Sequence, residues 1–225
     1  MSTITPDAPG QSPENAPKRA PIQTFLNRYL RPAIVLTLLL TILTGLIYPG
    51  IVTGLAQLIF PSQANGSLVT VNGRVIGSDL IGQYWTSLKY FHGRPSATVN
   101  LNGTPSPYEA DNSSGSNLGP TSKVLVQDVQ QRVAALQAEF KQEHLPVPAG
   151  SVPVDLVTTS ASGLDPDITI AAALYQAPIV AKARGLSQSV VQQLIMSHVH
   201  GRFLFIFGEP YVNVLELNMA LDALK

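Results

Sequence analysis

The stretch AIVLTLLLTILTGLIYPGIVTGLAQLIF, residues 33–60, decides how this chain is organised. It contains no charged residue, and its one strongly polar side chain is Gln57. A helix needs about 20 apolar residues to cross the ~30 Å core of a bilayer, and at ~1.5 Å per residue this stretch reaches about 42 Å. We therefore predict one transmembrane helix, since a buried helix of a soluble domain would show a polar face. Pro49-Gly50 is expected to kink the helix or to mark its exit.

The charges on either side of this stretch predict its orientation. Four basic residues precede it, and they are Lys18, Arg19, Arg28 and Arg31. The next charged residue after it is Arg74. Because cationic flanks stay in the cytoplasm, we expect the N-terminus inside and everything after Phe60 outside. No small-residue cleavage pattern follows Phe60, which favours an uncleaved anchor over a signal peptide.

Composition divides the chain into three parts. Residues 1–24 are rich in proline and small polar residues, and we expect a disordered cytoplasmic tail. Residues 25–60 form the membrane approach and the single transmembrane helix. Residues 61–225 are long enough for one compact extracytoplasmic domain with its own core. This part carries 10 Lys/Arg and 12 Asp/Glu, which gives no sign of a nucleic-acid-binding surface. The chain has no cysteine, which excludes disulfides and thiolate metal sites.

Hydrophobic periodicity and turn signals predict an α+β fold for the third part. Asn72-Gly73 separates two β-branched runs and predicts a hairpin. Residues 82–120 are rich in turn formers and predict a long loop, which either has a function or is disordered. The other expected elements are a helix over 121–143, a strand over 152–157, a helix over 170–184 between Thr169 and Gly185, a short helix after Ser187, a buried strand over 203–207 and a last helix capped by Asn213.

Motifs for common enzymatic chemistry are missing from the sequence. It has no phosphate-binding P-loop, no G-x-S-x-G nucleophile elbow and no D-K-T-G phosphorylation sequence of a P-type pump. His198 and His200 are two residues apart, so on a helix they would point in different directions and make a poor metal site. The Gly/Ser turns at 113–119 and 160–163 offer backbone N–H groups to an anion, or are tight turns that need glycine.

Several short blocks along the chain carry a family resemblance. In chain order they are LRP (30–32), GLIYP (45–49), QANGS (63–67), YFHGRPSA (90–97), SSGSNLGP (113–120), SGLDP (162–166), AALYQ (172–176), VAKARGL (180–186) and GEPYVNVLELN (208–218). Together and in this order they strongly resemble the KdpC family, the C subunit of the bacterial high-affinity potassium-transporting ATPase. The resemblance runs from about Leu30 to Leu224.

The resemblance implies a non-catalytic accessory subunit of an ATP-driven potassium uptake pump in the bacterial inner membrane. It implies one membrane helix and an extracytoplasmic mixed α/β domain that are needed for assembly and stability of the complex. The implied partners are the potassium-translocating subunit, the P-type ATPase catalytic subunit and a small membrane subunit. No firmly bound cofactor is implied, but family members have been proposed to assist ATP binding through the glutamine that corresponds to Gln176.

Four residues are expected to contact the partner subunits. Gly45 would let a partner helix approach closely within the membrane. Arg94, Ser116 and Asn117 lie in the loop blocks, and loops at a surface often serve recognition. For Arg94 the alternative is an ion pair inside its own domain.

Two rival functions remain open from the sequence. One is a membrane-anchored ligand-binding or sensor domain that acts alone, which would need a concave pocket. The other is a tethered hydrolase based on Ser116 or Ser162, which would need a histidine and a carboxylate at that serine.

Overall fold

The computed structural model describes residues 22–224, and the chain divides into two units at the boundary between Pro61 and Ser62. Most of the predicted tail, residues 1–21, lies outside the described residues. Residues 22–24 of that tail already belong to helix α1 (Ile22–Phe25).

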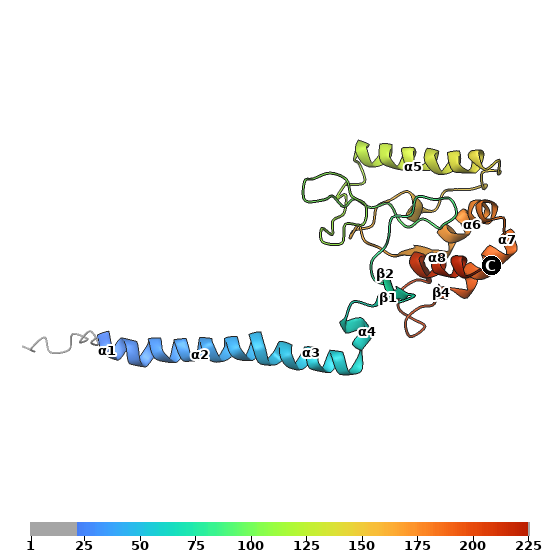
Figure 1. The fold of residues 1–225 in the computed structure, drawn as a ribbon. Helices are drawn as coiled ribbons and strands as arrows, with labels where there is room; N and C mark the ends of the chain where they lie inside the picture. Colours follow the sequence, from blue (N-terminus) through green and yellow to red (C-terminus); the bar gives the residue numbers. More distant parts are fainter. Residues whose placement is uncertain (1–21, 225) are drawn as a thin grey trace, which may run out of the picture. The chain divides into compact units, whose positions relative to one another are not determined.

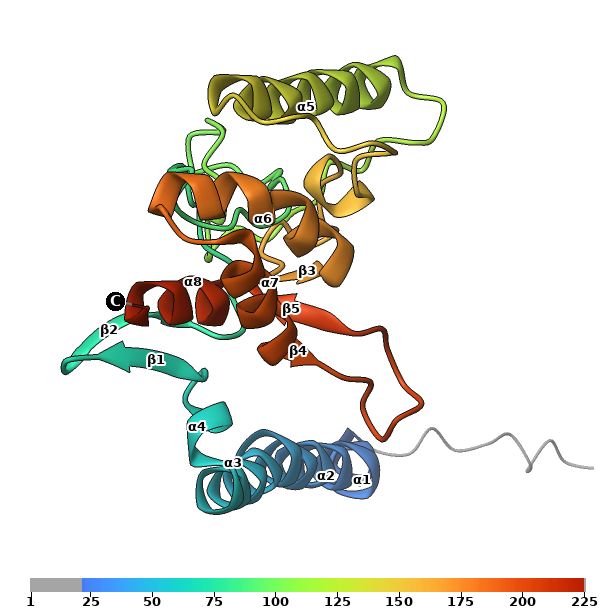
Figure 2. The same ribbon diagram turned by 90° about the vertical axis from the view of Figure 1, so that its right-hand side faces the viewer.

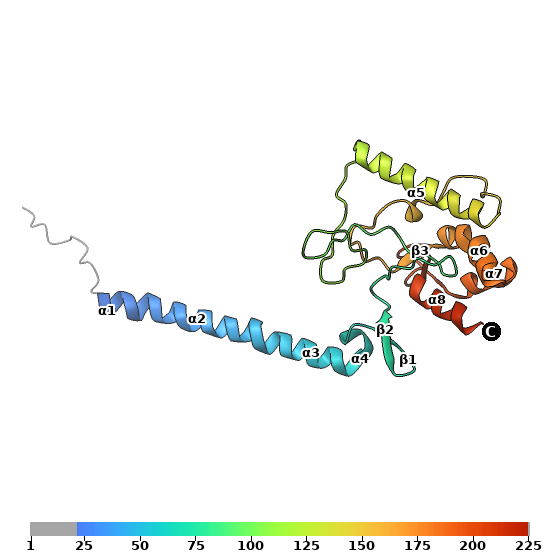
Figure 3. The ribbon, with the colours of Figure 1, turned by 45° about the horizontal axis from the view of Figure 1, so that its top comes forward.

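The first unit is one long run of helix (Figures 1 and 3). After α1 its segments are η1 (Leu26–Leu30), α2 (Arg31–Ile42), η2 (Leu43–Ile47) and α3 (Tyr48–Ile59). Residues 26–59 are long and apolar enough to cross a membrane, and their side chains are almost all exposed. A helix that is apolar on every side finds its most favourable surroundings in lipid.

The helix continues past Pro49 to Ile59, so Pro49-Gly50 does not end the helix. The turn just before this proline, η2, widens to a π-helical turn, in which the Tyr48 N–H bonds to the carbonyl of Leu43. The same widening occurs in η1, just before Pro32. Because proline cannot donate a backbone hydrogen bond and its ring crowds the preceding turn, a local change of winding is the expected response.

The second unit begins with the short helix α4 (Pro61–Ala64), which spans the boundary, and the hairpin β1 (Leu68–Val71) and β2 (Arg74–Ser78). Asn72 and Gly73 form the turn with φ of 51° and 77°. Two consecutive positive φ values are the mark of a type I′ turn, and the predicted hairpin is confirmed.

Residues 79–122 contain no regular helix and no strand longer than an isolated bridge (Figure 3). Helix α5 (Lys123–Gln142) follows, with the Ser122 side chain capping its first turn. Its apolar stripe ends in the buried Phe140, whose ring packs edge-on against Tyr175 of α6 (Ile170–Arg184) at 5.3 Å. The predicted helix over 121–143 is confirmed, and α5 lies over α6 (Figures 1 and 2).

The C-terminal half forms a three-stranded antiparallel sheet and three helices. The elements are η3 (Val154–Leu156), β3 (Asp167–Thr169), α6 (Ile170–Arg184), α7 (Gln188–Ser197), β4 (Val199–His200), β5 (Tyr211–Asn213) and α8 (Val214–Ala223), with sheet order β3-β5-β4. Thr169, Ser187 and Asn213 cap the three helices, and Gly185 ends α6 at φ 67°. All four predicted helix ends are confirmed.

One core fills the space between these elements. Its buried members are Phe91, Leu156, Val157, Ile168, Ala172, Ala173, Ala177, Val180, Ala181, Val191, Ile195, Val212, Val214, Leu217 and Leu221. The run of alanines on α6 allows the helix to pack closely against its neighbours. Phe91 is the member that comes from the long irregular stretch, and it ties that stretch to the core.

Two predicted strands are wrong. Residues 152–157 contain the short 3₁₀ turn η3, since Pro153 cannot join a strand ladder and Asp155 turns inward to accept a 2.7 Å hydrogen bond from the Thr169 N–H. Residues 203–207 form an exposed turn, because Leu204 and Phe205 adopt positive φ and bring Phe203 opposite Phe207.

Candidate functional site

Asn218 holds the buried end of the long irregular stretch. This asparagine lies on α8 and is fully buried. Its Oδ1 accepts from the Phe91 N–H at 2.8 Å, and its Nδ2 donates to the Phe91 carbonyl at 2.9 Å. The carboxamide therefore takes the place of a neighbouring strand and satisfies both backbone groups of a residue that no water reaches.

Gln176 on α6 makes the same pair of hydrogen bonds to the backbone of the next residue, His92. Its Oε1 accepts from the His92 N–H at 2.8 Å, and its Nε2 donates to the His92 carbonyl at 3.1 Å. Nε2 also reaches the Ala172 carbonyl at 3.3 Å. We call Asn218 and Gln176 together the carboxamide clamp. The glutamine implied by family resemblance to assist ATP binding is 5% exposed, and both ends of its amide are used inside the domain.

Beyond the clamp, three loops meet at one place. We call residues 90–97, 113–120 and 160–165 the loop cluster. The Ser162 carbonyl accepts from the Ser114 N–H at 3.0 Å and from the Ser113 hydroxyl at 2.9 Å, and Ser96 Oγ donates to the Gly163 carbonyl at 2.7 Å. Blocks that are far apart in the sequence are thus held together by direct hydrogen bonds. The sequence did not indicate that they meet.

Glycines allow this close approach at two points. Gly163 has φ 68°, and a Cβ on it would lie 2.5 Å from the Ser114 carbonyl oxygen. A Cβ on Gly115 would lie 2.7 Å from the carbonyl oxygen of Ala161. Both distances are shorter than carbon and oxygen tolerate, so a larger residue at either position would push the loops apart.

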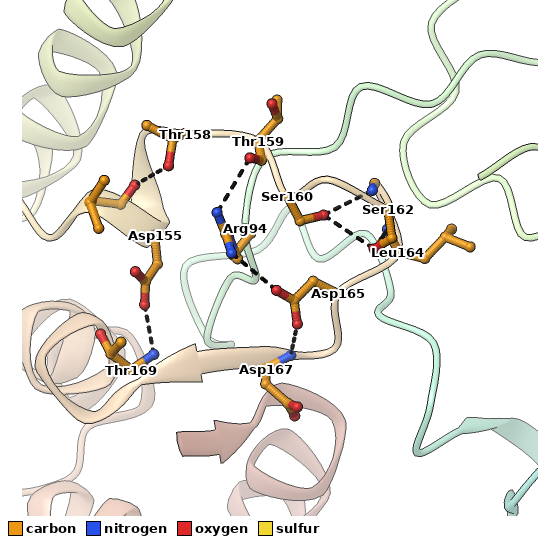
Figure 4. A network of polar contacts seen from close by, with 12 residues as sticks. Arg94, Asp155, Thr158, Thr159, Ser160, Ser162, Leu164, Asp165, Asp167 and Thr169 are labelled. Carbon is orange, nitrogen blue, oxygen red and sulfur yellow. Dashed lines mark hydrogen bonds and ion pairs between the residues drawn. The ribbon is translucent and has the colours of Figure 1, made fainter. Parts of the chain in front are cut away.

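Arg94 is bound inside the loop cluster. Its Nη1 lies 3.2 Å from Asp165 Oδ2, and its Nη2 donates to the Thr159 carbonyl at 3.3 Å (Figure 4). Asp165 Oδ1 also accepts from the Asp167 N–H at 3.1 Å. The alternative left open by the sequence, an ion pair within the domain, is the arrangement that the structure has. The guanidinium braces residues 159–167 against the loop that carries it.

The Gly/Ser turns use their own donors. The Gly163 N–H bonds to Ser160 Oγ at 2.9 Å, and the Leu164 N–H bonds to Ser162 Oγ at 3.1 Å (Figure 4). The Ser114 N–H donates to the Ser162 carbonyl. Of the two interpretations of these turns, the contacts agree with tight turns rather than with an anion site.

The edge of the loop cluster at residues 116–120 is more open. Ser116 is half-buried, and its hydroxyl accepts from Thr159 Oγ1 at 3.2 Å. Asn117 is exposed and has φ 52°. Gly119 and Pro120 are also exposed, and beyond its chain neighbours a Cβ on Gly119 would meet no described atom within 4 Å. This edge is tied to the rest of the loop cluster through the Ser116 hydroxyl, and Asn117, Gly119 and Pro120 are exposed.

A cavity of about 440 Å³ lies beside the loop cluster, against α5. Its walls include Trp85, Arg94, Tyr108 and Arg132. The Tyr108 hydroxyl donates to the Arg94 carbonyl at 2.6 Å, and Arg132 Nη1 donates to the Val157 carbonyl at 2.9 Å. Burial, with the Asp165 carboxylate as a second cause, raises the pKa of Tyr108 to about 12. The phenol therefore stays protonated and remains a donor at neutral pH.

Asp167, at the start of β3, is a carboxyl group beside the loop cluster whose pKa is strongly shifted. Burial, and secondly the nearby Asp165 carboxylate, raise its pKa to about 6, against an ordinary value of 3.8. The hydrogen bond from Asn213 Nδ2 to Asp167 Oδ1, at 3.2 Å, works in the opposite direction. Its charged form therefore costs stability above about pH 6, and this cost is relieved as the pH falls toward 4.

We expect Asp167→Asn to stabilise the C-terminal domain by about 1 kcal/mol near pH 7.5, a value discounted because the side chain is half exposed. The amide oxygen can still accept from Asn213. Below about pH 5 wild type carries a proton on this group and the advantage should shrink. Urea unfolding of both chains near pH 7.5 and below pH 5 measures this difference in unfolding free energy. An equal gain in stability at the two pH values would show that the charge of Asp167 is not responsible.

The hydrolase alternative would need a histidine and a carboxylate at Ser116 or Ser162, and the described residues do not show this arrangement. Within residues 22–224, neither Ser116 nor Ser162 hydrogen bonds with a histidine. The same residues contain no group of three or more His, Asp or Glu side chains arranged to hold a metal ion. His200 Nε2 instead contacts Glu216 Oε2 at 2.8 Å, and its ring stacks on Tyr211.

Comparison with known proteins decides the family. Residues 30–223 match the family described as "K+-transporting ATPase, c chain". The chain belongs to the KdpC family. It is 57% identical over 189 residues to the "Potassium-transporting ATPase KdpC subunit" of Rhodopseudomonas palustris strain BisB18. These 189 residues make up 81% of this chain and 92% of that protein. The subunit of the same name from Bradyrhizobium diazoefficiens is 55% identical over 186 residues, 80% of this chain and 89% of its own. The Methylobacterium nodulans subunit is 53% identical over 188 residues, 81% and 90% of the two chains.

Membership confirms the resemblance and the broad function. A KdpC chain is a non-catalytic subunit of the Kdp potassium-transporting ATPase, and other Kdp subunits are its partners. The fold agrees, with one apolar N-terminal helix followed by a mixed helix and sheet domain. The carboxamide clamp and the loop cluster are built largely from the blocks that carried the resemblance.

Proposed function

We propose that the C-terminal domain lies outside the cytoplasm and docks on the potassium-translocating subunit through the open edge of the loop cluster, residues 116–120. In this role the chain stabilises the assembled pump, and the ATPase subunit carries out catalysis. The observation that carries the proposal is the loop cluster itself, an irregular surface held in one shape from behind.

Pre-organisation supports this docking edge. The clamp, the Arg94–Asp165 ion pair and the hydrogen bonds between the loops hold the backbone before any partner arrives. A surface that is already ordered loses less conformational entropy on binding. Ser116 and Asn117 would contribute contacts at this edge, with Arg94 acting behind them as a brace.

The orientation is supported by the four basic residues before the helix and by the lack of charge for more than ten residues after it. Within the membrane, we propose that the face around Gly45 meets a partner helix. Thr44 Oγ1 donates to the Leu40 carbonyl at 2.7 Å, so this polar group is satisfied within the helix. Beyond the surrounding backbone of its own helix, a Cβ placed on Gly45 would have no neighbour within 4 Å among the described residues. A small residue at such a position permits close helix approach.

For Gln176 we propose an indirect effect on the pump. Its amide is buried and engaged with His92, so a substitution would act through the loop at 90–97. Any influence on the ATP requirement of the assembled pump would then follow from changed docking, with no contact between Gln176 and the nucleotide.

Gly119→Arg tests the docking edge. The added side chain projects from a position with free space, so the melting temperature of the purified chain should stay within about 2 °C of wild type. A bulky cation in the middle of the contact should reduce co-purification of the other pump subunits by at least about tenfold. Ala138→Arg, on the exposed face of α5, places the same side chain away from the loop cluster and should leave co-purification unchanged.

If the Gly119→Arg chain captures its partners as well as wild type does, the docking surface lies elsewhere. The stand-alone sensor domain that the sequence left open does not fit a chain of the KdpC family, which is a subunit of the Kdp ATPase.

A further inference from the structure

Residues 203–207, which we call the apolar tip, project from the domain between β4 and β5 (Figure 2). Their sequence is FLFIF, and each side chain is 61–95% exposed, with Phe205 the most exposed. Five consecutive large apolar residues in contact with water are unusual in a domain with an otherwise well-formed core. The tip therefore needs a covering surface.

The backbone of the tip is closed on itself. Phe203 and Phe207 exchange two N–H to carbonyl bonds of 2.9 Å each. The Phe205 N–H bonds to the Arg202 carbonyl at 3.1 Å, and the Ile206 N–H bonds to the Phe203 carbonyl at 3.2 Å. These N–H groups need no water, so the tip can enter an apolar environment without leaving those donors unsatisfied.

Charge marks the base of the tip. Arg202 and Glu209 flank it and pair with each other at 2.8 Å, and no charged residue lies between them. Aromatic and aliphatic side chains above a charged base are typical of segments that enter the interfacial layer of a membrane, where the charges remain among the lipid headgroups.

The chain itself keeps this domain near lipid. Residues 60–67 separate the end of α3 from the start of β1, and eight residues reach at most about 28 Å. A domain on so short a connection stays beside the bilayer that holds its helix. A lipid surface is thus the apolar partner that is always within range, whatever else the pump contains.

We propose that the apolar tip inserts into the interfacial layer of the leaflet on the domain's own side, as a second membrane contact besides the helix. This does not depend on the docking edge at 116–120. Because the chain has no cysteine, a single Phe205→Cys substitution labelled with an environment-sensitive fluorophore reports on the tip alone. Leu101→Cys, at a 90% exposed apolar residue of a different loop, is the matched control.

The full chain is reconstituted alone in phosphatidylcholine–phosphatidylglycerol vesicles, with and without lipids carrying a nitroxide near the headgroup. We expect the nitroxide lipid to reduce the emission of the label at 205 about threefold and to change the emission of the label at 101 little. Phe205 is almost fully exposed, so its replacement should not affect folding, and an unchanged melting temperature checks this.

A label at 205 that is quenched by aqueous iodide as fully as the label at 101, and is unaffected by nitroxide lipid, would overturn the proposal. Protection from iodide only in the assembled pump, again without quenching by nitroxide lipid, would also overturn it, because the tip would then be a contact for another subunit.

Discussion

Asn218→Leu is expected to destabilise the C-terminal domain by about 3 kcal/mol, because it leaves two buried backbone groups without partners. Leucine keeps the branching of asparagine but is larger, so crowding in the core adds to the loss of the hydrogen bonds. Phe91 has no exposed surface, and water cannot replace the bonds that Asn218 made to its N–H and carbonyl. In a domain of this size we expect the melting temperature to fall by about 10 °C.

Gln176→Leu provides the matched comparison. A side-chain carboxamide is again removed, and in this variant the N–H and carbonyl of His92 lose their partner. His92 is only half-buried, so water can reach it. The loss should be about 1–2 kcal/mol. Thermal or urea unfolding of both purified chains measures the difference. An Asn218→Leu chain as stable as wild type would mean that the loop at 90–97 is held by its other contacts and that the clamp is unimportant.

Local sequence signals predicted the parts of the fold that depend on nearby residues. The Asn72-Gly73 turn, the caps at Thr169, Ser187 and Asn213, and the glycine end of α6 all follow from the chemistry of a few adjacent residues. The apolar stripe of α5 follows from its period alone. These features need no knowledge of the rest of the chain.

The two mistaken strands show where local reasoning ends. The run at 203–207 has high strand propensity, but within residues 22–224 no neighbouring strand pairs with it, and positive φ values turn it back on itself. At 152–157 Pro153 and the hydrogen bond from the Thr169 N–H to Asp155 favour a turn over a strand. Strand propensity describes a pleated, partnered setting, and neither segment has that setting.

The candidate site could be predicted only in part. The blocks at 90–97, 113–120 and 162–166 stood out, but their mutual contacts arise from the fold. Asn218 was missed as a functional position. A signal was present, since a polar residue adjoins the apolar positions Leu217 and Leu221 of the last helix. Such a residue is buried only when it has partners, and in this case the partner is a backbone 127 positions away.

The orientation of the chain has the largest consequence for its function. If the C-terminal domain lies outside the cytoplasm, the docking edge faces the outer side of the potassium-translocating subunit, and Gln176 is separated by the membrane from cytosolic ATP. If it lies inside, both proposals about this domain's role in the pump fail together. The flanking charges predict the first arrangement.

Cysteine labelling in intact cells measures this most directly, because the natural chain has no cysteine and each variant gives a single signal. The Leu101→Cys chain, with its exposed loop position, and a Ser12→Cys chain are treated with a membrane-impermeant maleimide before and after permeabilisation. We expect complete labelling at 101 in intact cells, and labelling at 12 only after the membrane is opened. Labelling at 12 in intact cells, with 101 protected until permeabilisation, would contradict it.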